Sequence, residues 1–576
     1  MNIFDIFRKR KQIPEPWAKY YTNGETNITI PNISIYEQLL RTSKQYPNLI
    51  AYEYFNKKVT FSKFIRQIDQ AAISFKKLGI KKGSIVSIVL PNVPEALISL
   101  YALNKLGAIA SMVHPLSSEE ELKEKFVSTK TTHLVMIDLY YKEIKRILKF
   151  TNIEKTIFVS ASDSMNIFMK IGYKLTQIGK NERIPRKKEF TTWSKFYNSS
   201  KFSKMKINTK FGKNTPAVIL SSGGTSGKPK NVIIQNRAFV LSSIQEKRVL
   251  KYLKPGDRAL AILPNFHGFG LSVCMHSVMV IGCTSILIPQ FDAKKFDTLF
   301  KKTKPTVALG VPTLFEALIN SKNEKDLDLS NLKYAISGGD LLPANLEKRI
   351  NEYFENHNSL ARITHGYGMS EALAAVTLGH DDINKSGSIG IPLPGNHIKI
   401  IDPATRKTQP FNEVGEICIH TKAFMMGYLN NESETNDALQ IHDDGHIWLH
   451  SGDLGYMDED GFIFYKGRQK RMIIKSGYNI YPSHIEEVIE SHPAVLQCTV
   501  VGVPHPYKQE VPKAFIVLKE GYISLLVKNQ IKEHCKKNLA KYMQPSEFVY
   551  RKSLPKTKLG KVDFKKLQSD IGEDDV

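Results

Sequence analysis

Cysteine is scarce in this chain of 576 residues, and the five that occur are scattered: Cys274, Cys283, Cys418, Cys498 and Cys535. None belongs to a C-x-x-C pair, and the number is odd. This pattern argues against a disulfide framework and a structural zinc site. It predicts a protein of a reducing compartment, which we expect to be the cytoplasm.

Basic runs interleaved with aromatic residues, which single-strand nucleic-acid binders need for stacking, are also missing. Although 81 lysines and arginines face 56 acidic residues, giving a net charge of +25, we therefore expect no nucleic-acid partner. The charge instead suits anionic substrates or an acidic membrane. A non-catalytic basic protein that binds nucleic acid or membranes is the remote alternative, and it predicts salt-sensitive binding.

A secretory signal is absent, because the charges of MNIFDIFRKRKQ follow its apolar residues and no long apolar core is present. We expect an N-terminal tail over residues 1–29. A short amphipathic membrane contact through IFDIF and RKRK is the alternative. The uncharged run Ala259 to Phe291 is interrupted by proline and glycine, which predicts buried strands flanking an apolar helix and not a membrane span.

Apolar strand patterns alternate with helical patterns, for example at 84–91 followed by 93–107, and again within 305–319. This alternation predicts an α/β fold with parallel sheets covered by helices. Residues 140–213 are lysine-rich and less periodic, which predicts a peripheral insertion. A hairpin signal ends near Arg468, so we expect a large domain at 30–467 and a small α+β domain at 468–576.

The stretch SSGGTSGKPK (221–230) lies between two strand patterns, AVIL (217–220) and NVIIQ (231–235). It does not match the P-loop, which runs from a strand into a helix and places Ser or Thr after its lysine. Its exposed backbone N–H groups could still surround an anion. A glycine-rich turn without function is the alternative.

Further glycine-rich or polar stretches directly follow apolar strand patterns. In open α/β sheets, ligands bind at the carboxyl ends of the strands. The stretches are SGGD (337–340), HGYGMSEA (365–372) and SGDLG (451–455), followed by KSGYN (475–479) and PKTKLGK (555–561). In this order and spacing they resemble the adenylate-forming superfamily of acyl-CoA synthetases, peptide-synthetase adenylation domains and beetle luciferases. The resemblance covers about residues 30 to 567.

The resemblance implies a large N-terminal adenylate-forming domain with helix-covered parallel sheets and a small, mobile α+β C-terminal domain. It also implies a reaction in two halves. A carboxylic acid first reacts with ATP and Mg²⁺ to give an acyl-adenylate and pyrophosphate. Coenzyme A then displaces AMP to form a thioester.

The resemblance also assigns ATP-binding residues. The phosphate loop contributes Ser222, Thr225, Ser226, Gly227 and Lys230, and Asn231 replaces the usual glycine after it. The adenine slot is formed by Gly338, Gly339 and Asp340 on one side and by Gly366, Tyr367 and Gly368 on the other. Tyr367 would stack on the base, although a core aromatic is the alternative.

Around the reacting phosphate, the resemblance assigns Glu371 and Thr225 to Mg²⁺, a hard cation that prefers oxygen ligands. Ser370 stands where threonine is usual and would donate to the α-phosphate. Asp453 would bind the ribose hydroxyls, with a turn-capping aspartate as the alternative. Arg468 would contact the ribose and phosphates.

In the small domain, Lys561 matches the family's catalytic lysine. A cation there would bridge the two anions that react. A solvated basic surface is the alternative, because other lysines lie nearby. Lys470 matches the hinge, and Lys475 and Gly477 of KSGYN would admit the pantetheine arm of coenzyme A.

The segment PNFHGFGLSVCMHSV (264–278) resembles the lining of the acyl pocket, with His267 as an aromatic gate and Met369 as a further substrate-binding residue. Its apolar character favours a medium- to long-chain fatty acid. Aryl acids stay open. The alternative acceptor is a separate acyl carrier protein, because no carrier domain follows Lys561 in this sequence.

Overall fold

The computed structural model describes residues 12–22, 24–176, 184–201, 203–222, 230–321, 327–380, 382–475, 478–522, 524–557 and 562–570. The chain divides into two compact units. The first comprises residues 1–342, 346–397 and 419–449, and the second comprises 343–345, 398–418 and 450–576. The division at residues 468–470 around a hinge stays a prediction.

An eight-stranded sheet in the first unit has the order β19-β9-β8-β4-β3-β5-β6-β7. Its strands are β3 (Ile85–Val89), β4 (Ile109–Met112), β5 (His133–Ile137), β6 (Lys155–Val159), β7 (Phe190–Thr192), β8 (Pro216–Ser222), β9 (Lys230–Gln235) and β19 (Gly427–Tyr428). Strands β3 to β8 pair in parallel, as the alternation predicts, whereas β9 and β19 are antiparallel.

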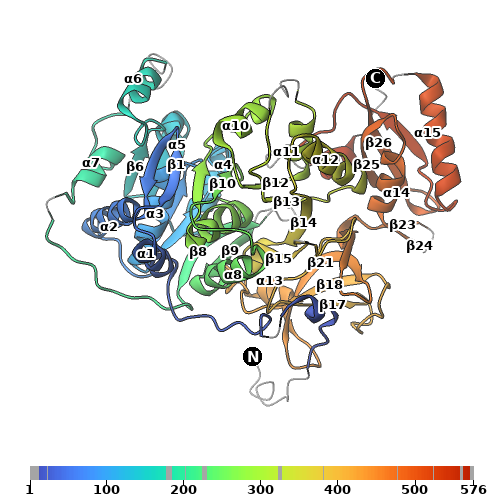
Figure 1. The fold of residues 1–576 in the computed structure, drawn as a ribbon, viewed down its shortest axis with the longest axis horizontal. Helices are drawn as coiled ribbons and strands as arrows, with labels where there is room; N and C mark the ends of the chain where they lie inside the picture. The colour runs from blue at the N-terminus through green and yellow to red at the C-terminus, as the bar shows by residue number, and fades with distance from the viewer. Residues whose placement is uncertain are drawn as a thin grey trace. The chain divides into compact units, whose positions relative to one another are not determined.

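The prediction of a peripheral insertion at 140–213 was incomplete. Strands β6 and β7 of this segment extend the sheet at its edge, and α7 (Trp193–Asn198) packs against both. The lysine-rich composition around them concealed these strands, and β7 at the edge is only three residues long. The segment also contains α5 (Tyr141–Ile147) and α6 (Ile167–Thr176), which lies far from the sheet centre in Figure 1.

A nine-stranded sheet in the same unit has the order β16-β15-β14-β13-β12-β10-β11-β1-β2. Its strands are β1 (Ile50–Tyr54), β2 (Lys57–Thr60), β10 (Arg258–Ala261), β11 (Thr284–Leu287), β12 (Val307–Gly310), β13 (Tyr334–Gly338), β14 (Ile363–Gly368), β15 (Ala375–Leu378) and β16 (Ile391–Pro392). Between β10 and β11 lie a π-helix, η5 (Phe269–Ser277), and α9 (Val278–Ile281).

The uncharged run Ala259 to Phe291 therefore forms buried strands around an apolar helix, as predicted. Within the part of the chain that the structure describes, no helix combines the length and apolarity needed to cross a bilayer. The side chains of Asn92 and Asn265 link the ends of β3 and β10. Asn92 donates to the carbonyl of Ala261 at 2.9 Å, and Asn265 donates to that of Pro91 at 2.7 Å.

Helices cover these sheets (Figure 1). They are α1 (Ile35–Gln45), α2 (Phe61–Lys77), α3 (Pro94–Lys105), α4 (Glu119–Ser128), α8 (Asn236–Val249), α10 (Phe296–Thr303), α11 (Pro312–Ile319), α12 (Ala344–Asn356) and α13 (Glu432–Ala438). Ser34 and Ser118 begin α1 and α4 with capping boxes, in which each serine and the glutamate three residues later satisfy otherwise free backbone N–H groups. Helix α3 is buried almost all round because it packs between α2 and strands β3 and β4.

The described part of the predicted N-terminal tail is packed. Trp17, in the 3₁₀ helix η2 (Pro16–Tyr20), is 1% exposed. The Tyr21 hydroxyl donates to the carbonyl of Pro392 at 2.8 Å. The predicted membrane contact through IFDIF lies outside the described residues.

A five-stranded sheet follows, in the order β17-β18-β21-β20 with β22 beside β21. The strands are β17 (His397–Ile401), β18 (Gly415–His420), β20 (Leu439–Ile441), β21 (Ile447–Met457) and β22 (Ile463–Arg468). The β21–β22 hairpin was predicted. The expectation that SGDLG follows a strand was wrong, because residues 451–455 lie inside β21. Gly452, at φ +67°, and a bulge at Leu454/Gly455 accommodate these small and polar residues within the strand.

The C-terminal part is α+β, as predicted. Its sheet contains β23 (Ile473–Lys475), β24 (Tyr478–Ile480), β25 (Val495–His505), β26 (Gln509–Leu518) and β27 (Glu547–Tyr550), and its helices are α14 (Pro482–Glu490), α15 (Leu525–Asn538) and α16 (Phe564–Ser569). Ile485, Ile516 and Ile531 belong to its own buried core.

Candidate active site

The phosphate-loop candidate is the connection of a β-hairpin, as the sequence predicts. Strands β8 and β9 are antiparallel, and Ser222 pairs with Lys230. Thr225, Ser226 and Gly227 lie outside the described residues. The Lys230 ammonium lies 3.0 Å from Glu434 Oε2 and 4.6 Å from the centre of the Tyr428 ring.

The two predicted walls of the adenine slot are adjacent in the nine-stranded sheet. Strands β13 and β14 run parallel, and Gly338 is the register partner of Gly366. A Cβ atom at Gly338 would lie 3.0 Å from Phe269 Cε1 and 3.1 Å from the Gly366 carbonyl oxygen. A Cβ atom at Gly338 would therefore be in unusually tight contact with both neighbours, which favours a residue without a side chain there.

A buried histidine connects the two walls. His365 Nε2 lies 2.9 Å from the carbonyl oxygen of Asp340, and burial lowers the pKa of His365 to about 4. The imidazole is therefore neutral near pH 7, and Nε2 donates to this carbonyl. Gly339 has φ +79° and turns the chain at the end of β13. Asp340, the next residue, is exposed. Tyr367 follows on β14 opposite Thr377 and is half-buried.

Glu371 lies on the short 3₁₀ helix η7 (Ser370–Ala372), which packs against β8 and β9. The Glu371 side chain is buried, and the Tyr428 hydroxyl donates to its Oε1 at 2.9 Å. Burial and the nearby carboxylate raise the pKa of the Tyr428 hydroxyl well above its usual range. Met369 is extended immediately before η7, and Ser370 is half-buried.

The backbone after Glu371 is strained. Leu373 has φ +70°, a conformation that costs a branched residue free energy and that is concentrated at functional sites. A Cβ atom at Gly368 would lie 1.5 Å from the Ala374 carbonyl oxygen, and one at Gly268 would lie 1.8 Å from that of Leu373. The backbone just after the HGYGMSEA motif therefore lies close to Gly268, in the segment that contains His267. His267 Nδ1 accepts a hydrogen bond from Phe269 N at 3.3 Å.

In the second unit, Asp453 and Arg468 pair across the β21–β22 hairpin. Arg468 Nε lies 2.9 Å from Asp453 Oδ1, and Asp453 is 1% exposed. Because Asp453 lies within a strand, the turn-capping alternative was wrong. Lys470 lies on the single-turn helix η8 (Gln469–Arg471).

Lys475 ends β23, and its ammonium donates to the Tyr542 carbonyl at 2.8 Å. Burial and the neighbouring Lys508 lower the pKa of Lys475. Gly477 and Lys561 lie outside the described residues. Lys556 and Val562, on either side of residues 558–561, form an antiparallel bridge.

Two family models match this chain. The model described as AMP-binding enzyme matches residues 39–429, and the one described as AMP-binding enzyme C-terminal domain matches residues 484–561. The chain belongs to the AMP-binding enzyme family. It is an AMP-forming acyl-CoA ligase of the adenylate-forming superfamily. Membership of this enzyme family rules out the alternative of a non-catalytic basic protein.

Relatives of this AMP-binding enzyme cover almost its whole length. The chain is 31% identical over 558 residues to the long-chain-fatty-acid–CoA ligase of Bacillus subtilis (strain 168). This alignment covers 96% of this chain and 97% of the relative. The chain is 30% identical to the probable 4-coumarate–CoA ligase 1 of Dictyostelium discoideum, with 95% and 97% covered. The solved structure of the anthranilate CoA ligase AuaEII with anthranoyl-AMP shares the fold, with a TM-score of 0.81, 23% identity and coverage of 95% and 98%.

Three residues of this AMP-binding enzyme were not predicted from its sequence: His365, Tyr428 and Glu434. His365 is the first residue of the predicted HGYGMSEA motif, but nothing in the sequence indicates its bond to Asp340. Tyr428 and Glu434 lie after the last predicted motif of the first unit, in a segment without a glycine-rich pattern. Only the pairing of β19 with β9 brings them to the hairpin.

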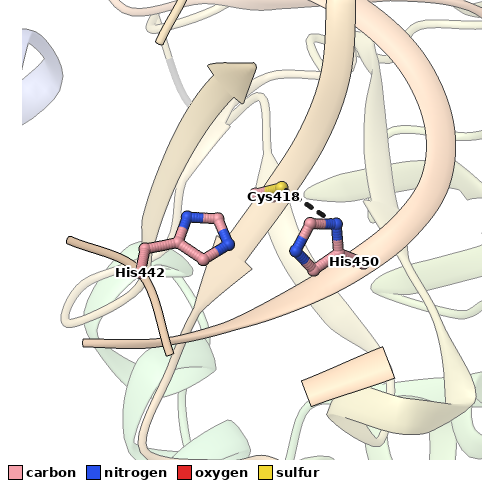
Figure 2. A group of neighbouring side chains, drawn as sticks. All are labelled: Cys418, His442 and His450. Atoms are coloured by element: carbon pink, nitrogen blue, oxygen red, sulfur yellow. Dashed lines mark hydrogen bonds between the residues drawn. The ribbon is translucent and has the colours of Figure 1, made fainter. Parts of the chain in front are cut away.

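A cysteine and a histidine form a separate polar contact in the second unit. Cys418 Sγ and His450 Nδ1 lie 3.8 Å apart, and this contact is the dashed line in Figure 2. His450 Nδ1 also lies 2.9 Å from Glu416 Oε2 and 3.0 Å from the Arg406 guanidinium. Burial raises the pKa of the Cys418 thiol well above its ordinary value. A protonated thiol and a nearby guanidinium disfavour a cation, so we interpret the contact as a structural hydrogen-bond network.

Proposed function

We propose that this acyl-CoA ligase activates a medium- to long-chain fatty acid and transfers it to coenzyme A. The observation that carries the proposal is the uncharged segment from Ala259 to Phe291, whose π-helix buries Leu271, Cys274 and Met275 beside His267. By the family resemblance this segment would line the acyl pocket, and apolar side chains there would suit an alkyl chain. The name of the Bacillus subtilis relative supports the same class of acid.

A second candidate substrate is an aryl acid. The Dictyostelium discoideum relative is named a probable 4-coumarate–CoA ligase and is 30% identical to this chain, nearly the value of the fatty-acid relative. A separate acyl carrier protein is the alternative acceptor. Both alternatives are arms of the experiment below.

In the proposed adenylation step, the β8–β9 hairpin and Lys230 bind the ATP phosphates through charge and hydrogen bonds. The glycine walls at Gly338 and Gly366 admit the adenine ring, and Tyr367 stacks on it. Asp453 accepts from the ribose hydroxyls, with Arg468 beside it. Lys561 places a cation where the substrate carboxylate approaches the α-phosphate, which lowers the electrostatic barrier between two anions.

Glu371 fits the proposed Mg²⁺ site chemically. Its Oε1 accepts from Tyr428, whereas its Oε2 accepts no hydrogen bond from the residues that the structure describes. A carboxylate oxygen of this kind is a suitable ligand for a hard cation, and the Thr225 hydroxyl would be a second. When bound, Mg²⁺ would neutralise charge on the phosphates.

For the second half-reaction we propose that the small domain rotates about Lys470, withdraws Lys561 and presents Lys475 and Gly477. Gly477 would leave room for the pantetheine arm. The thiolate of coenzyme A attacks the acyl carbon, the bond from that carbon to the phosphate oxygen breaks, and AMP leaves. This alternation is the family's scheme, applied to the matching residues of this chain.

The experiment measures pyrophosphate release from ATP over a panel of alkyl and aryl acids, with coenzyme A, with a carrier protein and with neither. We expect medium- to long-chain fatty acids to give the highest kcat/KM and a thioester only with coenzyme A. Preference for aryl acids would overturn the fatty-acid proposal, and a thioester formed only on the carrier would overturn the acceptor.

The role of Lys561 has its own test. Lys561→Ala should abolish acyl-adenylate formation and leave thioester formation from supplied acyl-adenylate largely intact. Lys558→Ala, in the same basic stretch, is the matched control and should retain both half-reactions. Loss of both half-reactions in folded Lys561→Ala would contradict the assigned role.

A further inference from the structure

A buried lysine lies at the base of the β8–β9 hairpin. Lys125 is on α4 and is 8% exposed. Its ammonium lies 2.9 Å from Ser221 Oγ on β8 and 2.5 Å from Asn231 Oδ1 on β9. Ser221 and Asn231 are register partners, one pair before Ser222 and Lys230. One side chain therefore bridges the two strands next to the connection that contains the predicted phosphate loop.

The asparagine continues this contact to neighbouring segments. Asn231 Nδ2 donates to Ser128 Oγ at 3.0 Å, at the end of α4. The Asn430 side chain donates to the Ser128 carbonyl at 3.1 Å, and the backbone N–H of Leu429 donates to the Asn231 carbonyl at 2.8 Å. Because Asn231 replaces the usual glycine, its side chain supplies an acceptor that glycine lacks.

Burial of the Lys125 ammonium costs the folded protein free energy. Burial lowers its pKa from 10.5 to about 7, and among the described residues no carboxylate forms an ion pair with it. Its hydrogen-bond partners are a hydroxyl and an amide, which compensate only in part for the loss of hydration. An apolar side chain would fill the same space at lower cost. The lysine therefore points to a role other than packing.

We propose that Lys125 is a positioning residue, which holds Ser221 on β8 and Asn231 on β9 in register so that the adjacent pair, Ser222 and Lys230, is placed to bind the ATP phosphates. This proposal rests on the proposed ATP-binding role of the hairpin. Lys125 contacts strand residues and not the nucleotide itself. Its loss is therefore expected to weaken ATP binding and to leave the acid and coenzyme A steps unchanged.

The test compares Lys125→Met with Lys125→Gln and with Lys123→Met, a matched change on the more exposed side of the same helix. In pyrophosphate release, we expect Lys125→Met to raise the KM for ATP about tenfold, because loss of both contacts to the strands leaves Ser222 and Lys230 less well placed for the phosphates. The KM for the acid and thioester formation from supplied acyl-adenylate should not change. Lys125→Gln keeps a donor and should restore part of the ATP affinity, and Lys123→Met should match the wild type.

Asn231→Ala provides a second route to the same contact. If Lys125 acts through Asn231, the double variant should raise the KM for ATP by less than the product of the single effects. An unchanged KM for ATP in an active Lys125→Met enzyme would overturn the proposal, as would equal losses in every half-reaction. Absence of ATP-dependent pyrophosphate release in the wild type would instead refute the proposed function.

Discussion

Replacement of Glu95 by glutamine should stabilise the protein at neutral and alkaline pH. Glu95, on α3, is 1% exposed and lines a cavity of 170 Å³ with Lys57 and Trp193. Ser164 Oγ donates to its Oε1 at 2.5 Å, and its Oε2 has no hydrogen-bond partner among the described residues. Burial raises the pKa of this carboxyl from 4.5 to about 7.

The sign of the effect follows from proton linkage. Between pH 4.5 and about 7, folded Glu95 keeps a proton that the unfolded chain releases. The free energy of unfolding therefore falls as the pH rises through this range, by about 3 kcal/mol in total. Glutamine has the same shape and carries no charge. Glu95→Gln should match the wild type near pH 4.5 and exceed its stability by up to about 3 kcal/mol at pH 8.

The assay is urea unfolding of both proteins at several pH values from 4.5 to 8. The control is Glu120→Gln, which removes an exposed carboxylate paired with Lys123 at 3.0 Å. Surface pairs of this kind contribute little, so the control should show no gain that grows with pH. Parallel stability curves for Glu95→Gln and the wild type would refute the reasoning.

Two further changes test the candidate site. Gly368→Ala should abolish ATP-dependent pyrophosphate release, because the new Cβ would lie 1.5 Å from the Ala374 carbonyl oxygen, whereas Gly172→Ala meets no atom within 4 Å and should leave activity unchanged. Full activity of Gly368→Ala would show that the backbone moves freely. Tyr428→Phe removes the donor to buried Glu371 and should lower the free energy of unfolding by about 1–3 kcal/mol, measured in urea. A variant as stable as the wild type would mean that water replaces the hydroxyl.

Local patterns predicted much of this fold and part of the site. Strands β8 and β9 and the end of β13 follow from apolar runs bounded by glycine, so Ser222 and Gly338 lie at strand ends as predicted. The prediction that HGYGMSEA follows a strand was wrong for residues 365–368, which lie inside β14. SGDLG was misplaced because small and polar residues usually end strands, and here a positive-φ glycine and a bulge keep them inside β21. The adenylation roles came from the family resemblance.

Contacts between distant segments were not predictable. Lys125 and Asn231 are 106 positions apart, and Glu371 and Tyr428 are 57 apart. Each pair depends on how helices and strands pack in three dimensions, and a single sequence carries no periodic signal for such pairings. A lysine in a helix pattern is ordinarily an exposed residue, so the burial of Lys125 runs against its usual preference.

The π-helix Phe269–Ser277 affects how a mutational scan of the proposed acyl-binding segment should be designed. Its backbone bonds join residues five apart, so each turn holds more residues than an α-helical turn. In an α-helix, residues three or four positions apart lie on the same face. In the wider π-helix the same spacing selects side chains on different faces, which contact different neighbours. Library positions should therefore follow the π-helical spacing, so that all of them lie on one face of Phe269–Ser277. Substitutions on that face could then alter the preference for acyl-chain length without changing the residues packed on the opposite face.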